Sequence, residues 1–318
     1  MQLLGIHHVT ALTARARDNL AFYTGVLGMR LVKKTVNQDD VGAYHLFYGD
    51  GVASPGSDLT FFDFAVPPAR HGTNSIARTG LRVHGEGVLT WWQERLEAHG
   101  VAHGPIVERG SRMTLDFTDP EGQRLALVDD GGAAPGAPWT HSPVPPACQI
   151  RGLGPVTLSV AHIDGTDEVL RGLLGMALVD RYATGGGDGG PPVHVYRMAG
   201  SGPHAEIHVA VEPERPAARP GAGGVHHLAL RIPDSDYAAW TERLRTRRLP
   251  ASGPVDRFYF RSLYFREPSG ILFEIATDGP GFTIDEPVEQ LGEGLSLPPF
   301  LEHRRAEIVA QLEPLTTD

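Results

Sequence analysis

The sequence contains a single cysteine, Cys148, among its 318 residues. One thiol cannot form an internal disulfide, and it cannot supply the thiolates of a cysteine-rich metal site. The sequence also lacks an apolar run long enough to cross a bilayer, and no basic region or long apolar stretch follows Met1. We therefore expect a cytoplasmic protein that has no contact with a membrane.

Positive charge is scarce and is not clustered. The chain has 28 Lys and Arg against 38 Asp and Glu, which gives a formal net charge of -10. Nucleic acids and anionic membranes bind clustered Lys and Arg, so this balance disfavours both as partners and favours a small-molecule substrate. The 41% apolar and 21% charged residues are typical of a globular protein, and the length allows two domains.

The two halves of the chain resemble each other. Residues 27–32 (LGMRLV) recur as 174–179 (LGMALV), a shift of 147, and residues 117–122 (FTDPEG) recur as 265–270 (FREPSG), a shift of 148. Such self-similarity indicates a duplicated architecture. We predict domains at 1–130 and 151–280, a Gly-, Ala- and Pro-rich linker at 131–150, and a tail at 281–318 that contains a helix near 299–312.

Each half divides further into two modules of a strand, a helix and more strands. In the first module we predict strands at 6–12, 29–36, 43–49 and 59–64 and a helix at 16–26. In the second module we predict strands near 80–83, 111–118 and 124–129 and a helix near 88–99. Modules three and four begin near residues 153 and 225, and the glycine-rich segment 185–190 reads as a hairpin loop.

Paired histidines open two of the predicted strands. Residues 5–10 (GIHHVT) resemble 224–229 (GVHHLA), and a lone glutamate, Glu274, lies in the apolar run 271–276 (ILFEIA). Two histidines and one carboxylate suggest a metal site with open positions. Strand alternation points one histidine of each pair away from such a site, and the spacing alone does not say which one.

The duplication separates these residues from the scaffold. The shift of 147 places His8 on Pro155, and the shift of 148 places Glu274 on Ala126. The strands are therefore present in both halves, although the histidine and the glutamate are not. Because a buried glutamate without a partner is costly, its presence indicates chemistry.

The chain resembles a known family in several of these features. The HHVT strand opening, the four modules, the EPSG turn before Phe273 and Glu274, and residues 281–286 (GFTIDE) are similar to the vicinal oxygen chelate superfamily. More narrowly, the chain resembles its hydroquinone-type ring-cleaving dioxygenases over nearly the whole length. The resemblance implies an α+β fold, in which four βαβββ modules form two half-open β-barrel units and a C-terminal helix follows.

The resemblance also implies a metal site and its ligands. His8, His227 and Glu274 are expected to hold Fe(II), with Mn(II) as the alternative metal. These residues lie on modules one and four, so sharing one ion requires those two modules to pair. Modules two and three would then form a similar unit without a metal.

Further site residues follow from the same resemblance. Tyr264 and Arg257 are expected beside the substrate, and His7, His226 and Thr10 around the ligands. In our hypothesis, a small aromatic substrate, a hydroquinone, binds the metal through one hydroxyl next to O2, and the ring opens beside that hydroxyl. Tyr264 would relay a proton, Arg257 would stabilise negative charge, and His226 would act as acid or base.

Two other functions fit the same fold. A lyase or isomerase resembling glyoxalase I would need a fourth protein ligand for Zn or Ni, and no obvious second glutamate is present. Asp63 lies on the closing strand of module one, where a fourth ligand could lie, but we expect it to have a structural role. A binding or resistance protein would need no metal ligands. The sequence leaves the oligomeric state open and allows a homo-oligomer.

Overall fold

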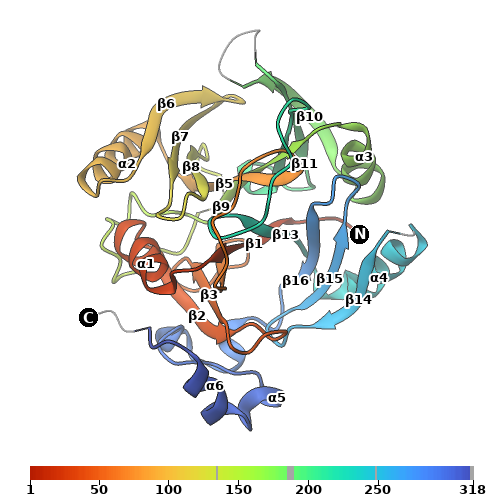
Figure 1. The fold of residues 1–318 in the computed structure, drawn as a ribbon. Helices are drawn as coiled ribbons and strands as arrows, with labels where there is room; N and C mark the ends of the chain where they lie inside the picture. The colour runs from red at the N-terminus through yellow and green to blue at the C-terminus, as the bar shows by residue number, and fades with distance from the viewer. Residues whose placement is uncertain (134, 185–189, 248, 316–318) are drawn as a thin grey trace.

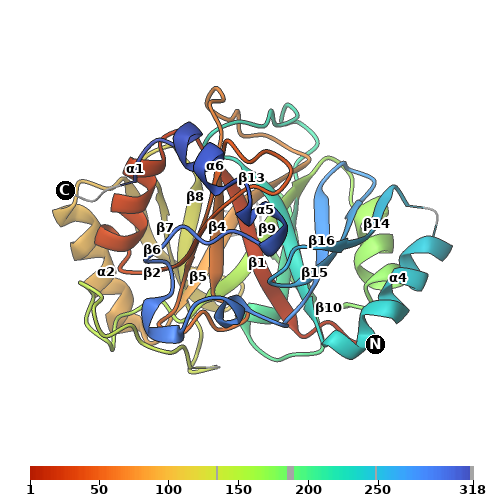
Figure 2. The same ribbon diagram turned by 90° about the horizontal axis from the view of Figure 1, so that it is seen from below.

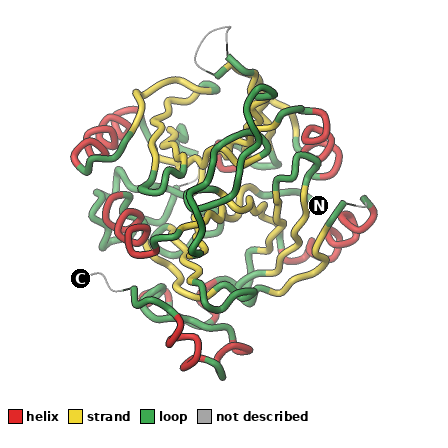
Figure 3. The backbone as a smooth tube through the Cα atoms, viewed as in Figure 1, coloured by secondary structure: helices red, strands yellow, loops and turns green. Residues whose placement is uncertain are grey.

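In the part of the chain that the structure describes, sixteen strands form two curled sheets of eight strands each, with helices on their outer sides (Figures 1 and 3). The computed structural model describes residues 1–133, 135–184, 190–247 and 249–315. We call the two sheets the first and the second half-barrel. In spatial order the first contains β14 (Ala251–Asp256), β15 (Arg261–Arg266), β16 (Leu272–Thr277), β13 (Val225–Ile232), β1 (Gly5–Thr13), β4 (Asp58–Asp63), β3 (Tyr44–Gly49) and β2 (Arg30–Val36).

The second half-barrel repeats this order with the remaining strands. It contains β10 (Ala177–Ala183), β11 (Pro192–Arg197), β12 (Glu206–Val211), β9 (Leu153–Val160), β5 (Ser75–Val83), β8 (Arg124–Asp129), β7 (Arg112–Thr118) and β6 (His103–Arg109). The strands β1 and β13 run antiparallel at the centre of the first sheet, and β5 and β9 do so in the second. The predicted pairing of module one with four and of two with three is therefore confirmed. The predicted domain boundaries remain a prediction.

The helices of modules one and three share an unusual last turn. The helix α1 (Ala16–Leu20) continues as a π-helical turn, η1 (Ala21–Val26), and α3 (Asp164–Asp167) continues as η2 (Glu168–Leu173). Gly28 and Gly175 follow with φ of 67° and 71°, a conformation that glycine adopts without strain. The predicted helix at 16–26 is therefore present, and its second half is wider than an α-helix.

The other helices are α2 (Glu86–Ala98) and α4 (Tyr237–Thr246), which lie at the periphery (Figure 1). Their tryptophans, Trp92 and Trp240, are fully buried against the sheets. The described residues also form short 3-10 turns: η3 (Pro203–Ala205), η4 (Asp234–Asp236), η5 (Phe282–Ile284) and η6 (Val288–Gln290). No described helix is long and apolar enough to cross a bilayer.

The C-terminal segment packs beside the first half-barrel (Figures 1 and 2) as two short helices, α5 (Pro299–Glu302) and α6 (Arg305–Gln311). The prediction of one continuous helix was wrong. The chain turns between these helices, and Leu301, Ile308 and Leu312 all reach the core. The apolar spacing was therefore informative about the buried face but not about the break.

Two other predictions of secondary structure need correction. The first strand of module two begins at Ser75 instead of near residue 80, because β5 pairs with β9 from Ser75 onward. The strand β6 was missed, since its residues at the sheet edge are half-buried or exposed and carry little apolar signal. The predicted hairpin loop at 185–190 falls largely on residues 185–189, which lie outside the described residues.

Candidate metal centre

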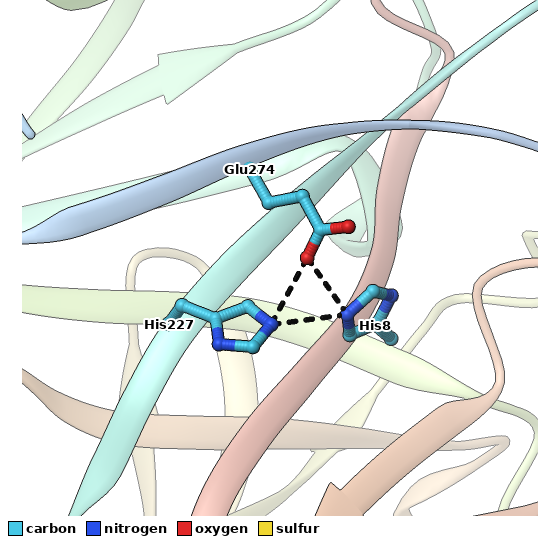
Figure 4. A group of neighbouring side chains, drawn as sticks. All are labelled: His8, His227 and Glu274. Atoms are coloured by element: carbon cyan, nitrogen blue, oxygen red, sulfur yellow. Dashed lines mark hydrogen bonds and ion pairs between the residues drawn. The ribbon is translucent and has the colours of Figure 1, made fainter. Parts of the chain in front are cut away.

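Three buried side chains from three neighbouring strands converge in the first half-barrel (Figure 4). His8 comes from β1, His227 from β13 and Glu274 from β16. The Nε2 atoms of the two histidines are 3.2 Å apart. Oε2 of Glu274 lies 3.1 Å from Nε2 of His8 and 3.0 Å from Nε2 of His227. The side chains are 2%, 4% and 0% exposed. Of each histidine pair, the second member therefore faces Glu274.

The hydrogen bonds of His7 determine which nitrogen of His8 carries a proton. Nε2 of His7 lies 3.1 Å from the carbonyl oxygen of Thr277, which can only accept, so this nitrogen donates. Burial lowers the pKa of His7 to about 3, so its ring is neutral and Nδ1 has no proton. His8 Nδ1, at 2.8 Å, must then donate to it. The lone pair of His8 Nε2 is left facing Glu274.

His226 makes the matching contact to the other ligand candidate. Its Nδ1 lies 2.8 Å from Nδ1 of His227, and burial lowers its pKa to about 4. Burial also lowers the pKa of His227. With His227 as the donor in this bond, its Nε2 lone pair also points at Glu274. His7 thus lies behind His8, and His226 lies behind His227. Each pair shares one hydrogen bond.

Glu274 supplies the negative charge of the group. Oε1 accepts a 2.5 Å hydrogen bond from Ser262. Oε2 has no hydrogen-bond donor among the described residues. One carboxylate oxygen and two imidazole lone pairs that face one another require a cation between them, so the residues fit a metal ion.

The distances between these donor atoms suit one shared ion. Two donors that each lie about 2.1 Å from an ion are about 3.0 to 3.4 Å apart. The observed separations are 3.0, 3.1 and 3.2 Å. Two histidines and one carboxylate would hold such an ion and would leave its other positions to small molecules.

A small cavity with aromatic walls adjoins these donors. Besides His8 and His227, its lining includes Phe47, Phe62 and Phe260. The ring of Phe260 lies 5.2 Å from that of His8. Flat apolar walls on two sides favour a planar aromatic ligand.

Tyr264 and Arg257, which the sequence analysis expects beside the substrate, line the same cavity. Arg257 Nε donates to the Tyr264 hydroxyl at 3.2 Å, and Arg257 Nη2 lies 3.0 Å from Asp39. Burial and the charge of Glu274 raise the pKa of Tyr264. Burial alone would lower the pKa of Arg257, but Tyr264 and Asp39 together have the larger, opposite effect and raise this pKa above its usual value. The phenol is therefore protonated and the guanidinium charged near neutral pH.

His45 is a cavity residue that the sequence analysis did not identify. Its ring is tilted against those of Phe47 and Phe62, with centroids 3.9 and 4.4 Å apart, and burial lowers its pKa well below the usual value. Its Nε2 lies 3.0 Å from the hydroxyl of Thr60, which contacts Thr10 at 2.8 Å. Its alternation with Phe47 on a predicted strand was the available signal.

Thr60 stands at the position that corresponds to Glu274. The register pairs Thr10 with Thr60 in β1 and β4, as it pairs Ala229 with Glu274 in β13 and β16. Asp63 lies three positions beyond Thr60, at the end of the strand. A fourth carboxylate ligand is therefore not found at the related position of the described structure.

A larger cleft of about 310 Å³ lies on the other side of His226, against about 40 Å³ for the cavity beside His8. It is lined by exposed arginines such as Arg70 and Arg219. No group of converging metal donors lies in it among the described residues. We assign the chemistry to the smaller cavity, because the ligand candidates converge there.

Comparison with known proteins identifies relatives of the whole chain. The model of the Glyoxalase/Bleomycin resistance protein/Dioxygenase superfamily matches residues 5–127 and 152–275. MhqA of Bacillus subtilis (strain 168), provisionally named a ring-cleaving dioxygenase, is 47% identical over 99% of this chain and 100% of its own length. The chlorohydroquinone/hydroquinone 1,2-dioxygenase of Sphingobium indicum is 29% identical over 96% of this chain and 94% of its own.

The fold is also found in a solved structure. A crystal structure from Bacillus subtilis subsp. subtilis str. 168, described provisionally as a dioxygenase, matches with a TM-score of 0.90 and 36% identity. The match covers 99% of this chain and 98% of that chain. The two half-barrels and the tail are thus a shared architecture.

Proposed function

The chain belongs to the Glyoxalase/Bleomycin resistance protein/Dioxygenase superfamily, and we propose that it is a ring-cleaving dioxygenase that uses non-haem Fe(II) and O2 on hydroquinone-type substrates. The relatives named above carry ring-cleaving names, and one of them names hydroquinones. The proposal assigns His8, His227 and Glu274 as the metal ligands.

One observation carries the proposal: the three converging acceptor atoms lie at the end of a cavity with aromatic walls and a charged arginine. A facial set of two histidines and a carboxylate is the arrangement of non-haem Fe(II) oxygenases, and it leaves room for substrate and O2. Bound iron would lower the pKa of a phenolic hydroxyl and give O2 access to its electrons. Mn(II) accepts the same ligands and is the alternative metal.

The residues around the ligands orient them. His7 Nδ1 accepts a hydrogen bond from His8 Nδ1, and His7 is itself fixed by the carbonyl of Thr277, so the ring of His8 cannot turn without breaking its bond to a fixed partner. His226 makes the matching Nδ1–Nδ1 contact with His227. We therefore assign His7 and His226 to positioning the ligands. Thr10 holds Thr60, which in turn contacts His45 beside the substrate cavity.

Tyr264 and Arg257 act on the substrate. Because Arg257 already donates to the phenol oxygen, the Tyr264 proton is free to point into the cavity. From there Tyr264 donates to a substrate oxygen as negative charge develops and then takes the proton back. Arg257, held by Asp39, stabilises that charge from the far side of Tyr264. The phenyl ring of Phe260 excludes water from the histidines.

The test is O2 uptake by protein loaded anaerobically with Fe(II) or Mn(II), using hydroquinone, chlorohydroquinone and catechol. We expect consumption of one O2 per substrate and a ring-opened product, with hydroquinones faster than catechol. The His227→Ala variant should bind less metal and consume no O2. His208→Ala is the matched control, because His208 is a buried histidine of the second half-barrel, and it should keep both properties.

Two results would contradict the proposal. Metal-loaded protein that consumes no O2 with any of these substrates would favour a lyase or isomerase. Full activity in His227→Ala would reject the ligand assignment.

A further inference from the structure

The second half-barrel has a cavity at the place that corresponds to the metal centre of the first. Ala126 occupies on β8 the position that Glu274 occupies on β16, as the registers with β5 and β13 show. Pro155 stands in place of His8 by the shift of 147 residues. Both residues line this cavity, so backbone and cavity are retained although the ligand candidates are not.

Arginines line this second cavity in place of metal ligands. Arg78 from β5, Arg109 from β6 and Arg112 from β7 surround it, and His208 from β12 lies beside them. The side chains of these arginines are 26%, 20% and 21% exposed. Three half-buried guanidinium groups around one cavity require negative charge nearby.

Asp116 is one of two carboxylates that supply this charge. Its Oδ1 and Oδ2 each accept a 2.8 Å hydrogen bond from Arg109, and Arg78 Nε lies 3.3 Å from Oδ1. The fork of Arg109 uses the carboxylate in a bidentate pair. Arg78 therefore has only the remaining, longer contact.

Glu206 is the other carboxylate, and it is fully occupied. It accepts from Arg112 at 2.6 and 3.0 Å and from Arg197 at 2.8 and 3.0 Å. His208 Nε2 lies 3.4 Å away, while its Nδ1 is 2.9 Å from the Tyr182 hydroxyl. Four arginines thus share two carboxylates, and positive charge is in excess.

Arg78 carries the excess charge. No hydrogen bond from its guanidinium to another described residue is found. Burial lowers the pKa of Arg78; Asp116 opposes this effect, but Arg109 and Arg124 add to it. A desolvated cation beside another arginine is stabilised by any anion that reaches it.

We infer that the second half-barrel binds a small oxyanion, a carboxylate or a phosphate, between Arg78, Arg109 and Arg112. Its oxygens complete the hydrogen bonds of Arg78, while Asp116 and Glu206 hold the other guanidinium groups in place. Ala126 and Pro155 leave the space that a carboxylate and a histidine occupy in the first half-barrel. This site is separate from the proposed active site and does not depend on its function.

Calorimetric titration of the full chain with inorganic phosphate and with maleate, at constant ionic strength, tests the inference. We expect saturable binding of at least one anion at one site per chain. Binding of phosphate or of maleate then shows whether the site takes a phosphate or a carboxylate. The Arg78→Gln variant should bind at least about tenfold more weakly, since a charge-assisted hydrogen bond is lost. Asp116 keeps its bidentate partner in this variant, so the fold should persist.

The corresponding arginine of the first half-barrel provides the matched control. Arg257 corresponds to Arg109 by the 148-residue shift and lines the proposed active site. Arg257→Gln should retain anion binding. Loss of binding in Arg257→Gln with retention in Arg78→Gln would place the anion in the active site and overturn the inference. Absence of saturable binding of both anions to the unmodified protein would overturn it as well.

Discussion

The two half-barrels have the same strand order and opposite local chemistry. In the first, acceptor atoms of two histidines and Glu274 converge with one negative charge; in the second, guanidinium groups surround the corresponding space. The turn beside each cavity keeps the left-handed conformation, with φ of 70° at Phe258 and 55° at Gly110. The backbone is thus retained, and substitutions at a few inward positions changed which kind of ligand it can hold.

The comparison also separates structural charge from functional charge. Glu206 in the second half-barrel is buried, but both of its oxygens accept hydrogen bonds from guanidinium groups. Glu274 is equally buried, and one of its oxygens has no donor among the described residues. A buried carboxylate with an unused oxygen indicates a missing cation, whereas a saturated one indicates a structural network.

The largest effect on metal binding and O2 uptake should come from neutralising Glu274, compared with the same change at Glu206. We expect Glu274→Gln to lose metal binding and to reduce O2 uptake to background, because an amide cannot replace the anionic ligand. Glu206→Gln is the matched change and should keep the metal and the activity. Metal content by elemental analysis and O2 uptake measure both variants. Equal metal content in the two variants would contradict the assignment of Glu274 as a metal ligand and Glu206 as part of a structural network.

A second carboxylate in the first half-barrel should be nearly as damaging. Thr60→Glu places a carboxylate at the position that corresponds to Glu274, where it would fill an open coordination position. We expect slower loss of metal to a chelator and at least about tenfold lower O2 uptake. Thr60→Val, which only removes the hydroxyl, should retain metal exchange and most activity. Tighter metal binding at full activity would contradict the role of an open position.

Removal of the Tyr264 hydroxyl should have an intermediate effect. We expect Tyr264→Phe to lower kcat by about a hundredfold, as for the loss of a proton donor, with little change in metal content. Steady-state O2 uptake over a range of hydroquinone concentrations gives kcat and KM. A rise in KM at unchanged kcat would show that Tyr264 only binds the substrate.

The smallest effect concerns the stability of the second half-barrel. Burial raises the pKa of Glu206, but His208 and the arginines hold it at about 2, below its ordinary value of 4.5. Such a group stabilises the fold above pH 4.5, and this contribution is lost as the pH falls towards 2. Because Arg112 and Arg197 are partly exposed, we expect Glu206→Gln to lower the free energy of unfolding by about 2 kcal/mol at pH 7.

Urea unfolding at pH 7 and at pH 3 measures this contribution. The difference between the unmodified protein and Glu206→Gln should shrink at the lower pH, since Glu206 is then almost fully protonated in the unfolded chain. A difference that is the same at both values would show that the ionised network does not stabilise the fold.

Much of the architecture could be predicted because the chain carries it twice. The strand openings at Leu153 and Val225 and the strand Arg124–Asp129 were predicted closely. The edge strand His103–Arg109 was missed, and the terminal helix was not predicted to break. Edge strands lack alternating apolar residues, and a break inside a short helix depends on what it packs against.

The sequence by itself determined the modules, their repetition and a short set of candidate ligands, because these follow from apolar periodicity and from residues that one copy has and the other lacks. Only the tertiary structure decided that His8 and His227 face Glu274. It also brought His45 beside Phe47 and Phe62, and Arg78 beside Arg109. Neighbouring residues on a strand point to opposite faces, so only the pairing and curl of the sheet decide which face encloses a site.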